Sequence, residues 1–109
     1  MADFPPMIFY ITTPDKKTAL KLANEMVKSK IVACANIIES VTSIYWWEEK
    51  INTEQECMMV VKTTERNSEK LIEYIENNHP YEVPECIGIN IAKGSQPYLQ
   101  WIVNSTTEE

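Results

Sequence analysis

The chain has 109 residues, of which 44% are hydrophobic, and a formal net charge of -6. This length and composition predict a single folded domain over residues 1–109 and argue against a disordered chain. Sixteen acidic residues against ten basic ones, without a basic cluster, argue against nucleic acid as a partner.

The cysteines and the N-terminal segment bear on the cellular compartment. Cys34, Cys57 and Cys86 are spaced too widely for a zinc finger, and their odd number is not a disulfide framework, so we expect reduced thiols. The N-terminus has no positively charged region typical of a secretory signal. No apolar run is long enough to span a membrane, so the prediction is a cytoplasmic protein without a membrane partner.

The first two predicted elements are a strand and a helix. Residues 7–13 are β-branched and aromatic, which predicts a buried strand. A helix is expected next, with Thr13 as N-cap, Pro14 at its first position and Asp15 in its first turn. Its apolar stripe consists of Ala19, Leu20, Ala23, Met26 and Val27.

A long hairpin and a second helix follow. Residues 31–47 predict a strand bent near Glu39 and Ser40, residues 48–54 a polar connection, and residues 55–65 the return strand. Residues 67–78 predict a helix with Ser68 as a possible cap and Leu71, Ile72 and Ile75 on its apolar side.

The end of the chain predicts a last strand and a short helix. The His79–Pro80 pair ends the second helix, residues 86–93 form the last strand, and residues 97–102 a terminal helix. The domain core then spans about 7–103, and residues 104–109 form a frayed acidic tail. The resulting fold class is α+β, a ferredoxin-like β-α-β-β-α-β plait with a short C-terminal helix.

The long central hairpin has a consequence for assembly. Its strands exceed the usual strand length, so their outer ends, with Tyr45, Trp46 and Trp47, would project beyond the sheet. The open face of the sheet also needs a cover, and another copy of the chain can supply one. We therefore expect a homo-oligomer.

His79 is the single histidine of the chain and the first candidate for chemistry. It is either a structural residue that bonds a backbone carbonyl or a ligand oriented by Glu82 or Glu85. One histidine with nearby carboxylates is too few for a closed zinc site from one chain. Cys34 could pair with His79 as nucleophile and base, but a cysteine in an apolar strand is usually inert.

Two other features could line a cleft or bind an anion. Tyr45, Trp46 and Trp47 fit an interface or a cleft wall. Lys62, at the end of a buried run, could bind an anion or a carboxylate, although a solvated strand end fits equally well.

Five sequence blocks resemble the CutA divalent-cation-tolerance family from about Ile8 to Trp101: "ACANII", "TSIYWWEEKI", "VVKTT", "HPYEVPE" and "GSQPYLQW". The resemblance implies a homotrimer of ferredoxin-like subunits, similar to PII signalling proteins, with clefts between subunits. It implies a link to tolerance of copper or another divalent cation, with no established enzymatic activity. No cofactor is expected to be required for folding.

The resemblance also implies site residues. Eight positions that match the family pattern are assigned to the ligand cleft: Cys34, Asn36, Tyr45, Trp47, Lys62, Tyr81, Tyr98 and Trp101. His79 and Glu85 are the expected metal ligands. Ile11 and Asn78 stand where bacterial members carry copper-ligand residues, and Glu49 stands where the family usually has glycine, which implies a different conformation of the hairpin tip.

Three functions follow as alternatives. The first is a trimeric binding module for a divalent cation or a small anionic ligand. The second is a structural or adaptor trimer without a ligand of its own. The third is an enzyme that uses Cys34 and His79.

Overall fold

The structure, a computed structural model, describes residues 4–107. Four strands and three helices follow each other along the chain: β1 (Pro6–Thr13), α1 (Lys16–Lys28), β2 (Cys34–Trp47), β3 (Lys50–Thr64), α2 (Glu65–Asn78), β4 (Ile87–Asn90) and α3 (Gln96–Ser105). The strands form one sheet in the order β2-β3-β1-β4, and each neighbouring pair is antiparallel. The predicted α+β fold with a four-stranded antiparallel sheet is confirmed for the single chain.

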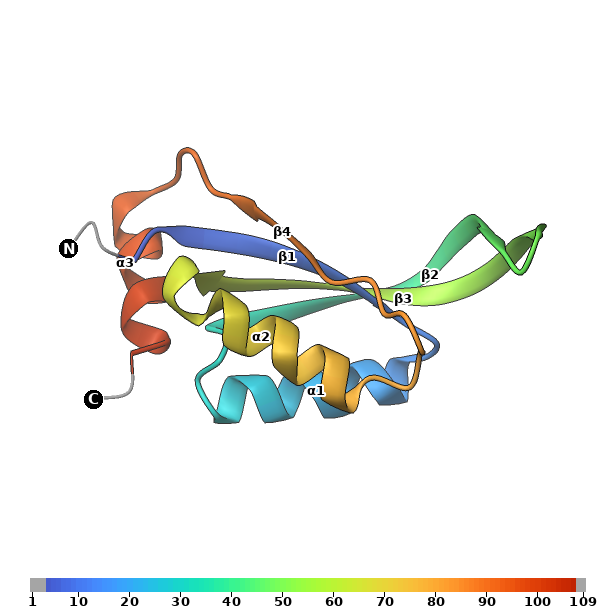
Figure 1. The fold of residues 1–109 in the computed structure, drawn as a ribbon. Coiled ribbons are helices and arrows are strands. Elements are labelled where there is room, and N and C mark those ends of the chain that lie inside the picture. The colour runs from blue at the N-terminus through green and yellow to red at the C-terminus, as the bar shows by residue number, and fades with distance from the viewer. Residues whose placement is uncertain (1–3, 108–109) are drawn as a thin grey trace.

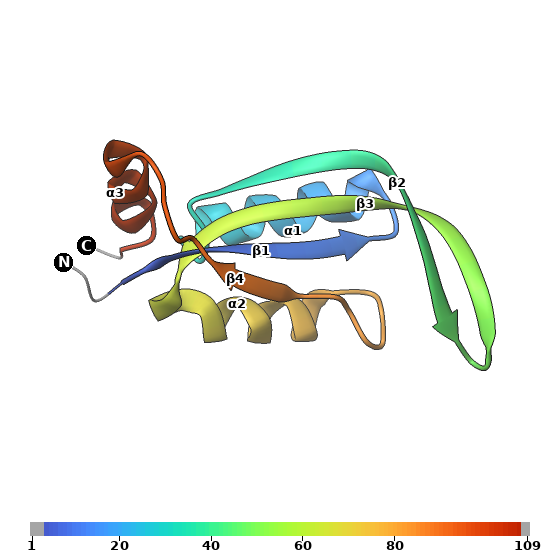
Figure 2. The ribbon, with the colours of Figure 1, turned by 90° about the horizontal axis from the view of Figure 1, so that it is seen from above.

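Both long helices lie on one face of the sheet (Figure 1). Viewed from above, α1 lies beneath β2 and β3 and α2 beneath β1 and β4, while α3 packs at one end of the sheet (Figure 2). The hairpin of β2 and β3 projects from the opposite end. This arrangement leaves one face of the sheet without a helix.

The hydrophobic core lies between the helices and the sheet. It forms because alternate residues of β1 and β3 point to the helices, and these meet one stripe of each helix. Its fully buried large side chains include Ile11, Leu22, Met26, Met59, Val61, Leu71 and Ile75. Burying such a side chain contributes about 1.5–3 kcal/mol to the free energy of folding.

Helix α1 begins later than the sequence pattern predicts. Asp15, not Thr13, is the N-cap, and its Oδ1 accepts a hydrogen bond of 2.8 Å from the backbone N–H of Thr18. The capping bond lowers the pKa of the Asp15 carboxyl, because it stabilises the charged form. Leu22 is in the core, whereas Leu20 and Val27 are exposed, so the apolar stripe was predicted partly on the wrong side.

The last two helices also differ from their predicted limits. Thr64 is the N-cap position of α2, and Ser68 instead donates from inside the first turn to the carbonyl of Glu65. Helix α3 continues to Ser105, and Thr106 is buried. Asn104 and Ser105, which the sequence pattern placed in the tail, are thus part of α3, while Glu108 and Glu109 lie outside the described residues.

Beyond the sheet, β2 and β3 continue as a two-stranded arm (residues 41–56), which gives the molecule principal extents of 47 × 25 × 22 Å. The predicted bend is present as a register shift between Ile38 and Val41, with Ser40 at φ 63°. The predicted connection over 48–54 is too long, because pairing continues to Trp47 and Lys50. Glu48 and Glu49 alone form the tip, at φ 52° and 66°.

The helix-free face of the sheet, called the open face below, is rich in apolar side chains. Strand alternation places Ile8, Tyr10, Ile38, Met58, Val60, Ile87 and Ile89 on it. Ile38, Ile87 and Ile89 are 51–57% exposed in the single subunit. Contiguous apolar surface of this kind marks an interaction site.

Gly88 of β4 packs so closely against β1 that we expect a larger residue at this position to destabilise the fold. A Cβ at Gly88 would lie 2.5 Å from Cζ of the buried Phe9 ring. We expect Gly88→Ala to lower the free energy of unfolding by about 1–3 kcal/mol, measured by urea denaturation, because the ring must move within a filled core. Gly94→Ala is the control: its Cβ meets the flexible Leu99 side chain, and an equal loss in both variants would contradict this explanation.

Candidate functional site: a cavity at the base of the arm

His79 lies in the segment after α2, residues 79–86, called the corner below. Its ring is 8% exposed, and both of its nitrogens are bonded within the chain. Nε2 lies 2.7 Å from the carbonyl of Thr12, and Nδ1 accepts from the backbone N–H of Tyr81 at 3.1 Å. Since Nδ1 is the acceptor, Nε2 carries the proton that is donated to Thr12. His79 thus fixes the corner to the end of β1.

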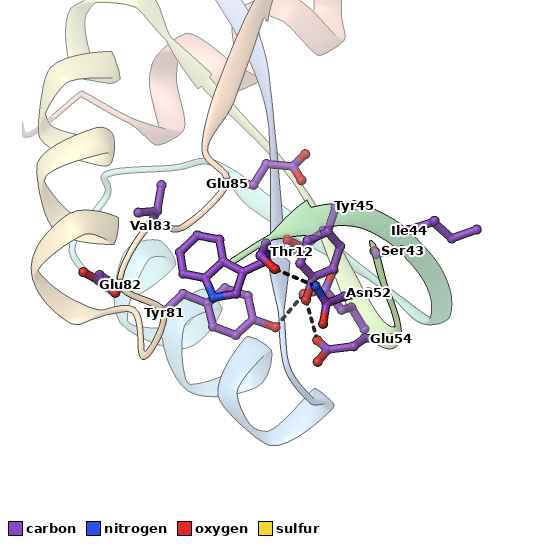
Figure 3. A pocket seen from close by; sticks show the side chains of 12 residues that line it. Thr12, Ser43, Ile44, Tyr45, Asn52, Glu54, Tyr81, Glu82, Val83 and Glu85 are labelled. Carbon is purple, nitrogen blue, oxygen red and sulfur yellow. Dashed lines mark hydrogen bonds between the residues drawn. The ribbon is translucent and has the colours of Figure 1, made fainter. Parts of the chain in front are cut away.

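A cavity of about 600 Å³ lies between the corner and the arm, called the hairpin cavity below. Twelve residues line it: Thr12, Ser43, Ile44, Tyr45, Trp47, Asn52, Glu54, Glu56, Tyr81, Glu82, Val83 and Glu85. The side chains of Tyr45, Asn52 and Glu54 come from the arm, and those of Tyr81 and Glu85 from the corner (Figure 3). A ligand here would contact segments far apart in the sequence.

Hydrogen bonds between tyrosines and glutamates order the walls of the hairpin cavity. Tyr45 Oη donates to Glu54 Oε1 at 2.9 Å, and Tyr81 Oη donates to Glu56 Oε2 at 2.5 Å. The pKa of the Tyr45 hydroxyl is raised chiefly by its bond to Glu54, and that of Tyr81 by burial and then by Glu56. Both phenols therefore act as donors, not as acids, at neutral pH.

A second group of predicted site residues lies at the other end of the hairpin and is called the Cys34–Tyr98 cluster. Cys34 Sγ lies 3.7 Å from Tyr98 Oη, and the Tyr98 ring stacks on Trp101 with centroids 5.4 Å apart. Lys62 Nζ donates to Asn36 Oδ1 at 2.5 Å. This cluster combines a thiol, a phenol and an ammonium group at the end of the open face nearest α3.

The structure thus divides the predicted ligand cleft into two sites. Tyr45, Trp47, Tyr81 and Glu85 line the hairpin cavity, whereas Cys34, Asn36, Lys62, Tyr98 and Trp101 form the Cys34–Tyr98 cluster. Lys62 of the Cys34–Tyr98 cluster pairs with Ile8 of β1, whereas the hairpin cavity includes Thr12, four residues further along β1. The two sites are therefore separated by about 13 Å along the strand. His79 bonds at the level of Thr12 and is not placed beside Cys34, so the predicted nucleophile–base pair is not formed within a subunit.

The expected metal ligands, His79 and Glu85, are not part of a larger ligand set in residues 4–107. No group of three or more His, Cys, Asp or Glu side chains there could hold a metal ion. The ring nitrogens of His79 could bind a metal only after one of their two hydrogen bonds is broken. Of the other thiols, Cys57 is buried, and burial raises the pKa of Cys86 to about 11, which suppresses its thiolate.

Sequence reasoning missed Glu54 and Glu56 as site residues. The sequence pattern placed Glu54 in the hairpin connection and Glu56 in the return strand, and it assigned neither residue a role in a site. The available signal was the alternation Asn52, Glu54, Glu56, which places these polar side chains on one face of a strand. The partner residue Tyr81 could not have been found in this way, because the corner that carries it has no regular period.

Comparisons with known proteins agree on one family. The sequence profile described as CutA1 divalent ion tolerance protein matches residues 7–105. The chain is 40% identical over 102 residues to "Protein CutA, chloroplastic" of Arabidopsis thaliana, covering 94% of this chain and 56% of that protein. It is 36% identical over 96 residues to "Divalent-cation tolerance protein CutA" of Escherichia coli, covering 88% and 86% of the two chains.

Solved structures give the same result for the fold. CutA1 from Oryza sativa superposes with a TM-score of 0.92 at 39% identity, over 96% of each chain. CutA1 from Ehrlichia chaffeensis superposes with a TM-score of 0.91 at 31% identity, over 97% and 99% of the two chains. Because the superpositions cover nearly the whole chain, they include the arm as well as the sheet.

The curated plant relatives are longer proteins. The chain spans 59% and 56% of the length of those from Oryza sativa and Arabidopsis thaliana. Among residues 4–107, no helix has the length and hydropathy needed to cross a membrane. The matched residues and the shared fold together show that this chain belongs to the CutA1 divalent ion tolerance protein family.

Proposed function

We propose that the chain is a ligand-binding module of divalent-cation tolerance that works as a homotrimer and not as an enzyme. Its ligand sites would lie where subunits meet, and the ligand would be a divalent cation such as copper or another small molecule. The single observation that carries the proposal is the hairpin cavity beside an uncovered apolar face.

Self-association is supported by the exposed apolar surface. The open face carries Ile38 and Ile89, and the outer side of the arm, away from the hairpin cavity, carries Trp46 and Ile51, with Trp46 70% exposed. Covering such a surface with a second copy of the chain removes it from water, at about 25 cal/mol per Å² of apolar area. A head-to-tail contact closes into a ring when a whole number of identical rotations from subunit to subunit completes one full turn. We propose the ring of three subunits.

The trimer would also reunite the predicted cleft. In the head-to-tail ring that we propose, the arm of one subunit would lie against the opposite end of its neighbour's sheet. The hairpin cavity and the neighbour's Cys34–Tyr98 cluster would then face the same cleft. This would bring carboxylates and the Lys62 ammonium together, although they lie apart in one subunit.

The oligomeric state tests the proposal directly. Native mass spectrometry of metal-stripped protein is expected to show a trimer, and Ile38→Asp combined with Ile89→Asp is expected to give monomers, because charges would be buried unpaired. Leu20→Asp, an exposed apolar residue on α1, is the control and should stay trimeric. A wild-type chain that stays monomeric at roughly 50 µM, well above the dissociation constant of a stable oligomer, would refute the assembly.

Titration of the same sample with copper(II) tests the metal. Stepwise uptake that saturates at one ion per subunit would support a metal ligand, and weak unsaturating adducts would exclude one. Because both nitrogens of His79 are already bonded, we expect His79→Phe to leave copper uptake unchanged.

An adaptor trimer is the second candidate function. It is favoured by one observation, that His79 is used to fix the corner and not directed into the hairpin cavity. In this case a protein partner would occupy the apolar outer side of the arm. Stoichiometric binding of any small ligand would argue against it.

A further inference from the structure

The hairpin cavity has walls of two chemical kinds. One is aromatic and consists of the rings of Tyr45, Trp47 and Tyr81. The other is acidic and consists of the carboxylates of four glutamates. The glutamates are Glu54, Glu56, Glu82 and Glu85, of which Glu82 is set back toward α2 (Figure 3). Among the described residues that line the cavity, none is Lys, Arg or His. The cavity therefore has a negative potential and π-electron faces.

Several polar hydrogens at this site are already used inside the protein. The hydroxyls of Tyr45 and Tyr81 donate to Glu54 and Glu56. The amide of Asn52 donates to the backbone carbonyls of Trp47 and Lys50, at 3.3 and 3.2 Å. What Tyr45, Tyr81 and Asn52 leave for a ligand are acceptor lone pairs, which favours a ligand that donates hydrogen bonds.

Glu56 is the acceptor that distinguishes this cavity from a solvated acidic surface. Its side chain is only 7% exposed, and one oxygen, Oε2, accepts from Tyr81. Glu56 lines the hairpin cavity, and in the described residues no buried side-chain oxygen is left without a hydrogen-bond partner. A carboxylate held in this way binds a donor without first losing rotamer freedom.

These features discriminate between classes of ligand. An anion would meet carboxylates and no cationic side chain. A hard divalent cation takes six to eight oxygens within about 2.6 Å, and the described carboxylates do not converge into such a group. An alkylammonium or guanidinium compound can donate to separated carboxylates while its carbon chain lies against the aromatic faces, which attract cations.

We propose that the hairpin cavity binds a small organic cation, an alkylammonium or guanidinium compound, with Glu54 and Glu56 as acceptors and Tyr45, Trp47 and Tyr81 as walls. The inference specifies the class of ligand for the binding module proposed above, and it therefore rests on that proposed function. The other occupant that the chemistry allows is the partner subunit's own lysine in the assembled ring.

Isothermal titration with agmatine, which carries a guanidinium and a primary ammonium group, tests the ligand class on metal-stripped protein. Magnesium chloride at the same concentration is the comparison, because Mg²⁺ has the same charge without an organic surface. We expect saturation at one agmatine per subunit and no saturable heat with Mg²⁺. Copper(II) that binds at the same stoichiometry and displaces agmatine would overturn the proposal in favour of a metal site.

Variants locate the binding. Glu56→Gln is expected to weaken agmatine binding at least tenfold, and Glu54→Gln and Trp47→Leu test the same site should Glu56→Gln not fold. Glu73→Gln, which removes the same charge from an exposed position on α2, should change the affinity less than twofold. If Glu73→Gln and Glu54→Gln lower the affinity for agmatine equally, the effect is a long-range effect of net charge and the hairpin cavity is not the binding site.

The oligomeric state of the same samples separates this inference from the function on which it rests. A trimer that does not bind agmatine refutes the ligand class and leaves the assembly intact, whereas a monomer that binds agmatine refutes the assembly alone. If wild-type protein is inert but Lys62→Met binds agmatine, the cavity holds the partner's lysine and the small-ligand proposal is wrong.

Discussion

Replacing Asn67 with alanine is expected to lower the free energy of unfolding by about 2–3 kcal/mol, because buried carbonyls then lose their donor. Asn67 lies in α2 and is 4% exposed. Its amide donates to the carbonyls of Lys30 and Thr106, at 3.1 and 3.2 Å, and more weakly to that of Ile31. One side chain thus joins α2 to the α1–β2 connection and to the end of α3.

Urea denaturation at fixed protein concentration measures this loss, and amide hydrogen exchange localises it. We expect the amides of α3 to lose protection first in Asn67→Ala, since its C-terminal end loses a donor at Thr106. Asn24→Ala is the matched control, because Asn24 is an exposed helical asparagine that bonds the carbonyl of Leu20 in its own helix. Similar losses in the two variants would show that helix propensity, not the buried bonds, determines the effect.

His79→Ala is expected to lower the free energy of unfolding by about 2–4 kcal/mol. The substitution removes a buried ring and leaves the carbonyl of Thr12 and the N–H of Tyr81 without their partners. The corner would then be released from β1, and with it Tyr81 from Glu56. Urea denaturation measures the stability, and agmatine titration measures the consequence for the hairpin cavity.

Two variants separate packing from hydrogen bonding in this effect. His79→Phe fills the same space without donor or acceptor, so it should recover the packing part of the loss alone. Asn77→Ala, at an exposed position two residues earlier, should be nearly neutral. If His79→Ala weakens copper binding without any change in stability, His79 is a ligand and our structural assignment is wrong.

The sheet and its helices were predictable because their patterns are periodic. Alternation along β1 and β3 and the apolar stripe of α2 place Ile11, Met59, Leu71 and Ile75 in the core, as found. The limits of α1 were predicted less well. Leu20 and Leu22 are two residues apart and lie on opposite sides of the helix, and Leu22 shares the buried side with Ala19, Ala23 and Met26.

The sequence named candidate site residues but did not predict how they are grouped within one chain. Tyr45, Tyr81 and Glu85 were named as site residues from the resemblance, and they do line one cavity. Lys62 and Cys34 were assigned to the same cleft, yet they lie with Asn36 and Tyr98 at the other end of the hairpin. A single sequence did not separate the two groups, because strand length sets their distance and because, in the trimer that we propose, a neighbouring subunit would decide whether they meet.

The tip of the arm sets an order of events during folding. Glu48 and Glu49 both adopt left-handed backbone angles, which cost residues with a side chain about 1–2 kcal/mol each. Because neither tip residue is Gly, Asn or Asp, we expect the turn to be a poor starting point for the hairpin. We therefore expect pairing of β2 with β3 to start near the sheet, where Ile37 meets Met59, and to proceed outward to the tip. In this order the open face forms together with the sheet, whereas the outer side of the arm, with Trp46 and Ile51, would complete its pairing last.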